Sequence, residues 1–178
     1  MVEREIDLSH FCHTEDDRPY LKQPWSRGEF TYATNGHVAV RVPRRADVPE
    51  NDEAPDVEGR ILSKLRFDDL RPITIPRLPP LRFMLIEGDG ILDVPYSALN
   101  SECARFAGAL FNLRYVHLLC WLPGLTMGPA ADEFSPSPFG FAGGGVGCLM
   151  PMEEIKDRPP HYDFGGLTTS PLPEESAP

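Results

Sequence analysis

The 178-residue chain has only four cysteines, and no two of them are spaced as a Cys-x-x-Cys pair. They are Cys12, Cys103, Cys120 and Cys148. Scattered cysteines of this kind favour small, reduced, buried side chains over a zinc site or a disulfide framework. The one cluster of metal-ligand type, His10-Phe11-Cys12-His13, has no second ligand pair at a conventional spacing. We therefore expect no metal and no other cofactor.

Long hydrophobic runs are also absent. Acidic and basic residues interrupt the first ten positions, and no later apolar stretch is long. A membrane-spanning helix needs about 20 consecutive apolar residues. We therefore expect neither a signal segment nor a membrane span, and we expect a cytoplasmic protein.

Motifs for catalysis are equally scarce. The glycine run at residues 143–145 is not followed by the Lys-Ser/Thr pair of a phosphate-binding loop. Acidic pairs such as Asp68-Asp69 are adjacent in sequence, so on a strand their side chains point to opposite faces. A thiol nucleophile assisted by His37, His117 or His161 stays open, but no spacing marks such a pair. We predict that the protein is not an enzyme.

Basic residues are in deficit: 17 Lys and Arg face 27 Asp and Glu, for a formal net charge of -10. Such a surface repels nucleic acid as a whole. The charges are nevertheless segregated into two neighbouring runs, which most often form solvated faces. The acidic run comprises Asp47, Glu50, Asp52, Glu53, Asp56 and Glu58. The basic run comprises Arg60, Lys64, Arg66, Arg71, Arg77 and Arg82.

The clearest structural signal in the sequence is a β-hairpin over residues 30–43. Two alternating segments meet at Asn35-Gly36, the dipeptide best suited to a type I′ turn because both residues tolerate positive φ. Alternation places Tyr32 and Thr34 on one side of the first strand. We expect this hairpin to present a polar rim.

The remaining pattern predicts one α+β domain over residues 1–158, followed by a disordered tail rich in Pro, Ser and Glu over residues 159–178. The domain should consist of two helix-plus-antiparallel-strand halves, with two helices on one face and two small sheets. The expected elements are a helix over 5–13, an exposed acidic loop over 44–59, interrupted strands over 60–86, a helix over 96–110, a strand over 113–122 and a last strand over 146–152. The second helix rests on an apolar stripe of Leu99, Cys103, Phe106 and Leu110.

Four short motifs, in the same order along the chain, resemble the bacterial replicative DNA sliding clamps. Residues 33–37, Ala-Thr-Asn-Gly-His, resemble the clamp hairpin Ala-Thr-Asp-Gly-His. Residues 16–21, Asp-Asp-Arg-Pro-Tyr-Leu, resemble the segment that follows the first clamp helix. Residues 94–99 resemble the start of the second clamp helix, and residues 148–153 resemble the closing strand with its Met-Pro-Met. The resemblance spans roughly residues 3–155.

The resemblance implies a single-domain relative of the clamps with a shallow apolar groove for a short linear peptide. Carried over residue by residue, the groove is lined by Thr34, Gly36, His37, Met150, Pro151 and Met152. Methionine suits adaptable peptide sites, and Pro and Gly limit the ordering lost on binding. This chain departs from the family in having room for one domain of three, and in having Val38 and Glu153 where the clamps have arginine.

Three functions remain open. The first is a non-catalytic clamp-like protein, encoded by a phage or mobile element and acting in the host-cell cytoplasm, that engages a replication factor or host protein through the groove. The second is an acidic DNA mimic that uses residues 47–58 to inhibit a host nucleic-acid-binding or defence complex. The third is a subunit of a homo-oligomeric sliding clamp. Because the first helix carries Glu3, Glu5 and Asp7 against Arg4, we expect no strong direct DNA binding.

Overall fold

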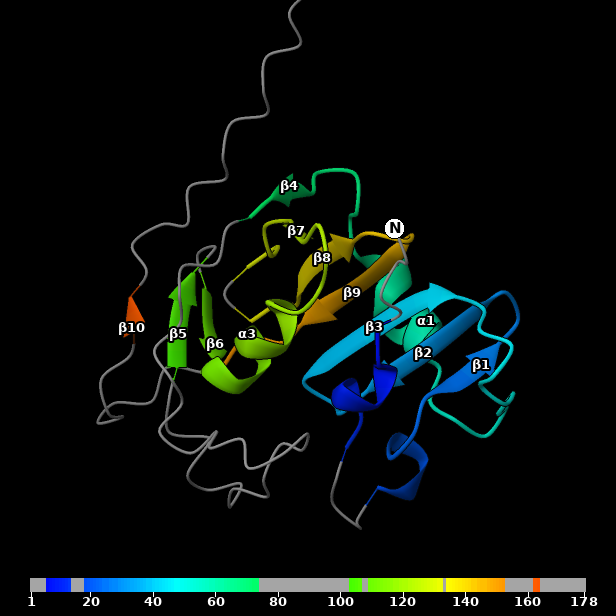
Figure 1. Ribbon diagram of the computed structural model, residues 1–178. Helices are drawn as coiled ribbons and strands as arrows, with labels where there is room; N and C mark the ends of the chain where they lie inside the picture. Colours follow the sequence, from blue (N-terminus) through cyan, green and yellow to red (C-terminus); the bar gives the residue numbers. More distant parts are fainter. Residues whose placement is uncertain are drawn as a thin grey trace, which may run out of the picture.

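The computed structural model describes residues 6–13, 18–73, 103–106, 109–132, 134–152 and 162–163, the strands at 103–106 and 162–163 by their backbone alone. These residues form a mixed α+β fold with a seven-stranded antiparallel sheet and two α-helices (Figure 1). The strand order of the large sheet is β1-β2-β3-β9-β8-β7-β4. Its strands are β1 (Trp25–Arg27), β2 (Phe30–Thr34), β3 (Val38–Pro43), β4 (Arg71–Pro72), β7 (Thr126–Met127), β8 (Ser137–Phe141) and β9 (Gly145–Leu149).

A second sheet has the order β10-β5-β6. It contains β5 (Cys103–Phe106), β6 (Ala109–Asn112) and β10 (Tyr162–Asp163), with β10 parallel to β5. The helices are α1 (Val57–Arg60) and α3 (Leu113–Leu119), and three single turns of 3-10 helix are η1 (Leu8–Phe11), η2 (Pro19–Leu21) and η3 (Leu62–Lys64). The predicted last strand is confirmed as β9, although it ends at Leu149 rather than at Met152.

The predicted hairpin is confirmed, because β2 and β3 pair antiparallel with Thr34 opposite Ala39 and Tyr32 opposite Arg41. The turn lies one residue later than expected. The Asn35 N–H donates to the Val38 carbonyl oxygen, so Gly36 and His37 are the two turn residues. Gly36 has φ +90°, which a residue with a side chain rarely adopts. The expected alternation therefore holds, and Gly36 is one of the two residues at which a positive φ was expected.

Each face of the large sheet packs against a different set of elements. Val38, Val40 and Leu149 belong to a buried cluster with residues of α3 and η1. Tyr32, Ala39 and Cys148, which alternate with them along the same strands, belong to a cluster with Val57 of α1. In Figure 1, η1 lies in front of strands β2 and β3 and α1 lies behind them. We call these two sides the α3 face and the α1 face.

The helices do not lie where the sequence pattern placed them. The predicted helix over 96–110 is wrong for residues 103–106 and 109–110, which belong to β5 and β6; its remaining residues lie outside the described part of the chain. The predicted strand over 113–122 is wrong, because residues 113–119 form α3. The predicted first helix is a single turn, η1. The two described α-helices, α1 and α3, pack on opposite faces of the large sheet, whereas the sequence pattern placed its two helices elsewhere and on one face.

A physical reason for the misplaced helix is that β6 is buried at all four positions. A short, continuously apolar run reads equally well as a buried strand or as part of a helix, so periodicity does not separate the two. Asn112 supplies the missing signal. Its side chain accepts a hydrogen bond from the Arg114 N–H at 2.9 Å and caps α3 at its first turn.

The tail and the interrupted strands are described only in part. Tyr162–Asp163, inside the predicted tail, form β10 beside β5. Arg71–Pro72 form the short strand β4, within the region where interrupted strands were expected. The rest of both regions, including Arg77 and Arg82 of the basic run, lies outside the described residues.

Candidate functional site

The site begins at the turn between β2 and β3, where side chains fix the backbone. The Thr34 hydroxyl donates to the Val38 carbonyl oxygen at 2.7 Å and accepts from the Gly36 N–H at 3.0 Å. The Asn35 side-chain oxygen accepts from the His37 and Val38 N–H groups at 2.9 and 3.0 Å. Thr34 and Asn35 are both buried. These four bonds hold the turn in one conformation, so it needs little further ordering to act as part of a binding site.

The segment after β9 continues past the large sheet and reaches the small one. The Met150 N–H donates to the His37 carbonyl oxygen at 2.8 Å, which extends the β3–β9 pairing by one step. Two residues later, the Met152 N–H donates to the Leu110 carbonyl oxygen of β6 at 2.7 Å. Met150 is therefore held beside the β2–β3 turn, whereas Met152 is tied to the second sheet.

A third element, the segment around α1, lies over the α1 face. Ala54 and Val57 are buried, and the Asp56 side chain accepts from the Gly59 N–H at 2.9 Å as the N-cap of the helix. The Glu58 carboxylate accepts hydrogen bonds from Arg41 of β3 at 2.8 and 2.9 Å. Residues 54–58 are thus fixed to the sheet, and the expectation of an exposed loop over residues 44–59 is wrong at its C-terminal end.

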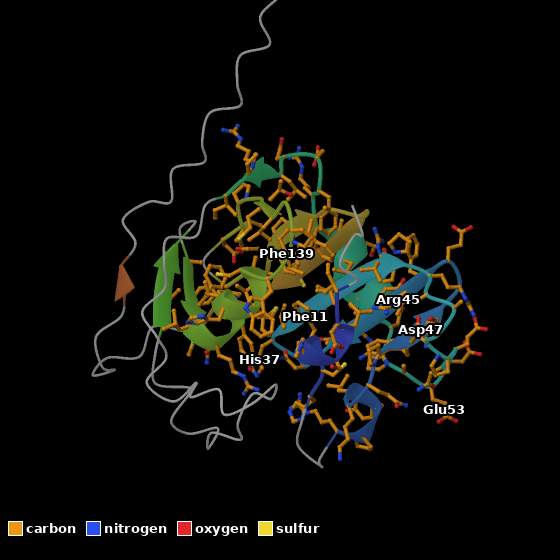
Figure 2. The ribbon with its side chains drawn as sticks, viewed as in Figure 1. Phe11, His37, Arg45, Asp47, Glu53 and Phe139 are labelled. Atoms are coloured by element: carbon orange, nitrogen blue, oxygen red, sulfur yellow. The ribbon has the colours of Figure 1, made fainter. Side chains whose placement is uncertain are left out.

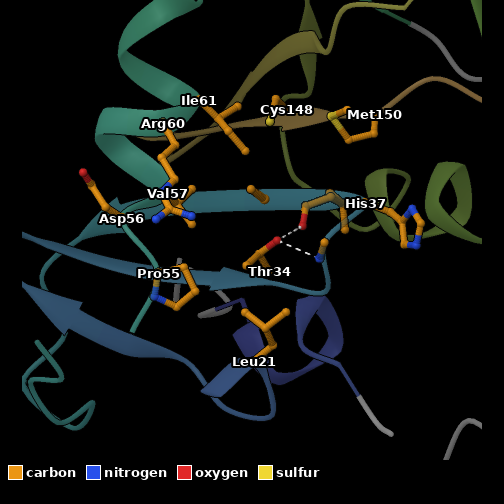
Figure 3. Close-up of a pocket in the computed structure, with 13 residues that line it drawn as sticks. Leu21, Thr34, His37, Pro55, Asp56, Val57, Arg60, Ile61, Cys148 and Met150 are labelled. Atoms are coloured by element: carbon orange, nitrogen blue, oxygen red, sulfur yellow. Dashed lines mark hydrogen bonds between the residues drawn. The ribbon is translucent and has the colours of Figure 1, made fainter. Parts of the chain in front are cut away.

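These three elements enclose a pocket of about 170 Å³ in the α1 face, shown in Figure 3. Ala39 of β3 lies directly opposite Cys148 of β9, and both residues line the pocket from the α1 face of the sheet. Their short side chains leave a depression that longer ones would fill. The lining residues with apolar side chains around it are Leu21, Val38, Pro55, Val57, Ile61 and Met150.

Few of the residues that line the pocket have polar side chains. Among the described lining residues they belong to Thr34, His37, Asp56 and Arg60. The Thr34 hydroxyl and the Asp56 carboxylate are engaged by backbone N–H groups. Arg60 is exposed and forms no ion pair with a carboxylate of the described residues. An apolar cavity with one anionic and one cationic side chain in its lining, Asp56 and Arg60, suits an apolar ligand group more than a phosphate or a sugar.

His37 joins the pocket to the α3 face of the sheet. Its ring stacks on Tyr115 of α3, with centroids 5.2 Å apart and an interplanar angle of 16°. Partial desolvation, followed by the positive charges of Arg18, His13 and Arg114, lowers the pKa of the His37 imidazole. The neutral ring is therefore favoured, which is consistent with a packing role beside the pocket.

Four of the six residues expected to line a peptide groove do line this pocket. They are Thr34, Gly36, His37 and Met150. Pro151 and Met152 are half-buried but do not line it, because the chain has by then turned toward the small sheet. Figure 3 shows Met150 and His37 on the same side of the pocket as the end of β9.

The acidic run is largely committed to partners within the chain. Glu58 pairs with Arg41, Glu50 with Arg44 at 3.2 Å and Asp47 with Arg45 at 3.3 Å. Asp56 caps α1, while Asp52 and Glu53 are exposed. In Figure 2, Asp47 and Glu53 lie at the β1 side of the molecule, and Asp47 is next to Arg45. Interleaved arginines make this surface a poor copy of the continuous negative charge of a DNA backbone.

The described part of the basic run is distributed over α1, η3, β4 and the segment between η3 and β4. Arg60 lies at the pocket, Lys64 is exposed on η3, and Arg71 is exposed on β4. Arg66 is paired with Asp68 at 3.1 Å and with Asp69 at 3.3 Å. Because Arg66 is neutralised by these carboxylates, it would release few counterions from nucleic acid.

The three thiols that the structure describes, those of Cys12, Cys120 and Cys148, are poor nucleophiles. Burial raises the pKa of both Cys12 and Cys148 to about 12, and burial also raises the pKa of Cys120. A protonated thiol is neither a nucleophile nor a metal ligand at neutral pH.

Within the described ranges, no group of three or more His, Cys, Asp or Glu side chains could hold a metal ion. Those ranges also contain no helix with the length and apolar character required to span a bilayer.

The α1 wall of the pocket was missed by sequence reasoning. Pro55, Val57 and Ile61 lie in the region interpreted as acidic loop and basic run, where charge dominated the composition. The available signal was Asp56 followed by Val57, an N-cap residue directly before an apolar one. Leu21 of η2 forms the opposite wall, and only the fold brings it to the pocket.

Comparison with known proteins adds no relative to this description. Neither a protein-family model, nor a curated protein, nor a solved structure matches the chain. The geometry of the pocket therefore carries the functional argument.

Proposed function

We propose that this protein is a non-catalytic binding protein that takes an apolar side chain of a partner protein's segment into the pocket beside the β2–β3 turn. The observation that carries the proposal is the pocket itself. A cavity of about 170 Å³ lined mainly by apolar side chains opens between a fixed turn, the end of β9 and α1.

The size of the pocket fits one large side chain. An engineered apolar cavity of about 150 Å³ in another protein binds benzene. A leucine, methionine or phenylalanine side chain is of that size, whereas a folded surface or a helix face is much larger. The pocket therefore favours a short partner segment that inserts one apolar side chain. At many interfaces a few such buried side chains contribute most of the binding energy.

The walls of the pocket are held in place before any ligand binds. The turn is fixed by hydrogen bonds from Thr34 and Asn35, and α1 is fixed by its Asp56 cap and by the Arg41–Glu58 ion pair. Preformed walls reduce the ordering cost of binding. The same features contain no activated nucleophile, which supports a binding role over a catalytic one.

The resemblance to sliding clamps supports the same site by an independent route. It assigns Thr34, Gly36, His37 and Met150 to a peptide groove, and these four residues share the pocket. We accordingly propose that the partner is a replication factor or another host protein, and that the chain has a phage or mobile-element origin. The paired acidic run makes the DNA-mimic alternative less attractive, and the net charge of -10 disfavours a DNA-encircling subunit.

The proposal is tested by selecting displayed random heptapeptides against the full-length chain. We expect the selected peptides to share one large apolar residue. Met150→Glu, which places a carboxylate in the pocket, should weaken their binding by about tenfold or more, equivalent to about 1.4 kcal/mol. Affinities are measured by fluorescence anisotropy with labelled peptides.

Met152→Glu is the matched control, because Met152 is the same residue type, is similarly half-buried and lies outside the pocket. Its affinity for the selected peptides should stay within about twofold of the original. Thermal unfolding of both variants checks the fold, and Ile61→Glu provides a second pocket variant if Met150→Glu does not fold. Selected peptides that bind all three variants equally well would contradict the proposal.

A further inference from the structure

A second cavity lies away from the pocket beside the β2–β3 turn, at the outer side of the α3 face. It has a volume of about 630 Å³ and shares no lining residue with that pocket. Ile6, Asp7, His10 and Phe11 line it from the segment around η1, and residues 121–123 line it from the turn that follows α3. We call this cavity the Trp121 groove.

Both segments that form the groove are held in place by hydrogen bonds. The Ile6 carbonyl oxygen accepts from the guanidinium of Arg45, directly after β3, at 2.8 Å. The Pro123 carbonyl oxygen accepts from the N–H of Ala142, directly after β8, at 2.8 Å. The groove therefore needs little further ordering to bind a ligand.

Trp121 presents an aromatic ring at the groove. Its side chain is 51 % exposed, while its backbone N–H donates to the Leu118 carbonyl oxygen of α3 at 3.2 Å. The His10 ring meets the Trp121 ring nearly at right angles, with centroids 5.1 Å apart and an interplanar angle of 84°. Among aromatic side chains, the indole ring attracts cations most strongly.

Asp7 gives the groove a negative charge. No lysine or arginine is among the lining residues, all of which the structure describes. Hydrogen bonds from Ser9, followed by the charges of His10 and Arg45, lower the pKa of the Asp7 carboxyl group. Arg45 does not line the groove and pairs with Asp47 at 3.3 Å. His10 is the other titratable lining residue, and its Nε2 lies 3.7 Å from the Asp7 carboxylate, with which it pairs when protonated.

A carboxylate beside an exposed indole matches the chemistry of an arginine side chain. The planar guanidinium stacks on aromatic faces and donates two parallel hydrogen bonds to a carboxylate. A lysine ammonium acts as a point charge and offers no flat face. The net charge of -10 attracts basic partner surfaces to this chain. The volume of about 630 Å³ has room for one long side chain together with adjoining backbone.

We propose that the Trp121 groove binds an arginine side chain of a partner protein, which stacks on Trp121 and pairs with Asp7. This site goes beyond the proposed function, because it uses a different cavity and a ligand group of different chemistry. The two sites can therefore be tested separately.

Nuclear magnetic resonance of the isotope-labelled full-length chain tests the site, because the chain has only two tryptophans. Trp25 is buried, whereas Trp121 is exposed in the groove. An acetylated and amidated Gly-Gly-Arg-Gly-Gly peptide should shift the indole N–H signal of Trp121 saturably and leave that of Trp25 unchanged. The same peptide with citrulline, which has nearly the shape of arginine without its charge, should bind about tenfold more weakly, and the lysine peptide about threefold more weakly.

Two variants separate the ring from the charge, and binding to them is followed on the backbone N–H signal of His10. Trp121→Leu keeps an apolar side chain without the indole and should weaken the arginine peptide by about tenfold. Asp7→Asn keeps a good N-cap residue without the charge and should weaken it by about fivefold. Tyr20→Leu and Asp52→Asn are the matched controls, because Tyr20 is 49 % exposed, Asp52 is exposed and neither lines the groove. Both should bind within about twofold of the unmodified chain.

Several outcomes would overturn the inference. They are no saturable shift of Trp121 up to about 10 mM arginine peptide, equally tight binding of the citrulline or lysine peptide, and unchanged binding by Trp121→Leu. Self-association of the unmodified chain in sedimentation velocity that Trp121→Leu abolishes would assign the groove to a second copy instead. None of these results changes the dependence of selected heptapeptides on Met150, which tests the proposed function alone.

Discussion

Among the residues that the structure describes, the two faces of the large sheet are covered to very different extents. On the α3 face, 18 buried residues join α3, η1 and β6 to the sheet in one cluster. On the α1 face, eight buried residues form a smaller cluster beneath α1 and η3. Because burial of apolar area is the main favourable contribution to folding, most of the stability should come from the α3 face.

The thinner cover leaves room for a binding site. The pocket opens where α1 stops short of the β2–β3 turn, over the small side chains of Ala39 and Cys148. A thicker layer would bury those positions completely. The comparison suggests a division of roles, with one face stabilising the fold and the other presenting a site.

The largest expected effect is on the α3 face, at Phe139. This fully buried ring packs against Gly147, where an added Cβ would meet both the ring and the backbone oxygen of Ala39. Phe139→Ala should lower the free energy of unfolding by about 3–5 kcal/mol, because the cavity over Gly147 has no side chain to fill it. Urea unfolding of the full chain measures the change. A loss under about 1 kcal/mol would show that this face does not dominate stability.

A smaller effect is expected on the α1 face, at Val57. Val57→Ala removes two methyl groups from a buried position in a four-residue helix, which should cost about 1–2 kcal/mol. Val57 also lines the pocket, so the affinity for selected peptides should fall together with stability. Arg60→Ala, an exposed change on the same helix, serves as the stability control. A loss as large as that of Phe139→Ala would remove the contrast between the faces.

The part of the fold that could be predicted from the sequence is local. Alternation from residue 30 to residue 43 fixed which side chains share a face, and the register of Tyr32 opposite Arg41 agrees with it. The turn was displaced by one residue because the Asn35 side chain bonds the His37 and Val38 N–H groups, which makes Asn35 the residue before the turn. Composition alone does not distinguish these two arrangements.

The elements after residue 100 were harder to predict because their apolar runs are continuous. β6 and α3 are consecutive, and both are buried on nearly every side. A run of this kind matches helix and strand templates equally well, and the environment decides. Asn112 as an N-cap was the local signal that separates them.

Four of the thirteen residues that line the pocket were predicted from the sequence. Thr34, Gly36, His37 and Met150 come from segments that the motif resemblance had marked. Leu21, Val57 and Ile61 come from distant segments whose approach depends on how the chain folds over the sheet. The ion pair between Glu58 and Arg41, which holds α1 in place, likewise links residues that sequence spacing does not relate.

The smallest expected effect lies at His37, where the two faces meet. Its ring stacks on Tyr115 of the α3 face and lines the pocket of the α1 face. Partial desolvation, together with the charges of Arg18, His13 and Arg114, lowers the pKa of this imidazole below its ordinary value of 6.5. The unfolded chain therefore binds a proton at this residue more readily than the folded chain. Stability should fall as the pH drops from above 6.5 through the folded-state pKa, and the contribution should level off below it.

His37→Gln removes this titration and leaves a polar side chain at the turn. Thermal midpoints of the original chain and the variant, measured at pH 8 and pH 5, isolate the effect, because the carboxyl groups that titrate in acid are common to both. The original chain should lose more stability between these two pH values than the variant does. Equal losses would mean that the charged form of the imidazole is not disfavoured in the folded chain. The stability would then not depend on pH through His37.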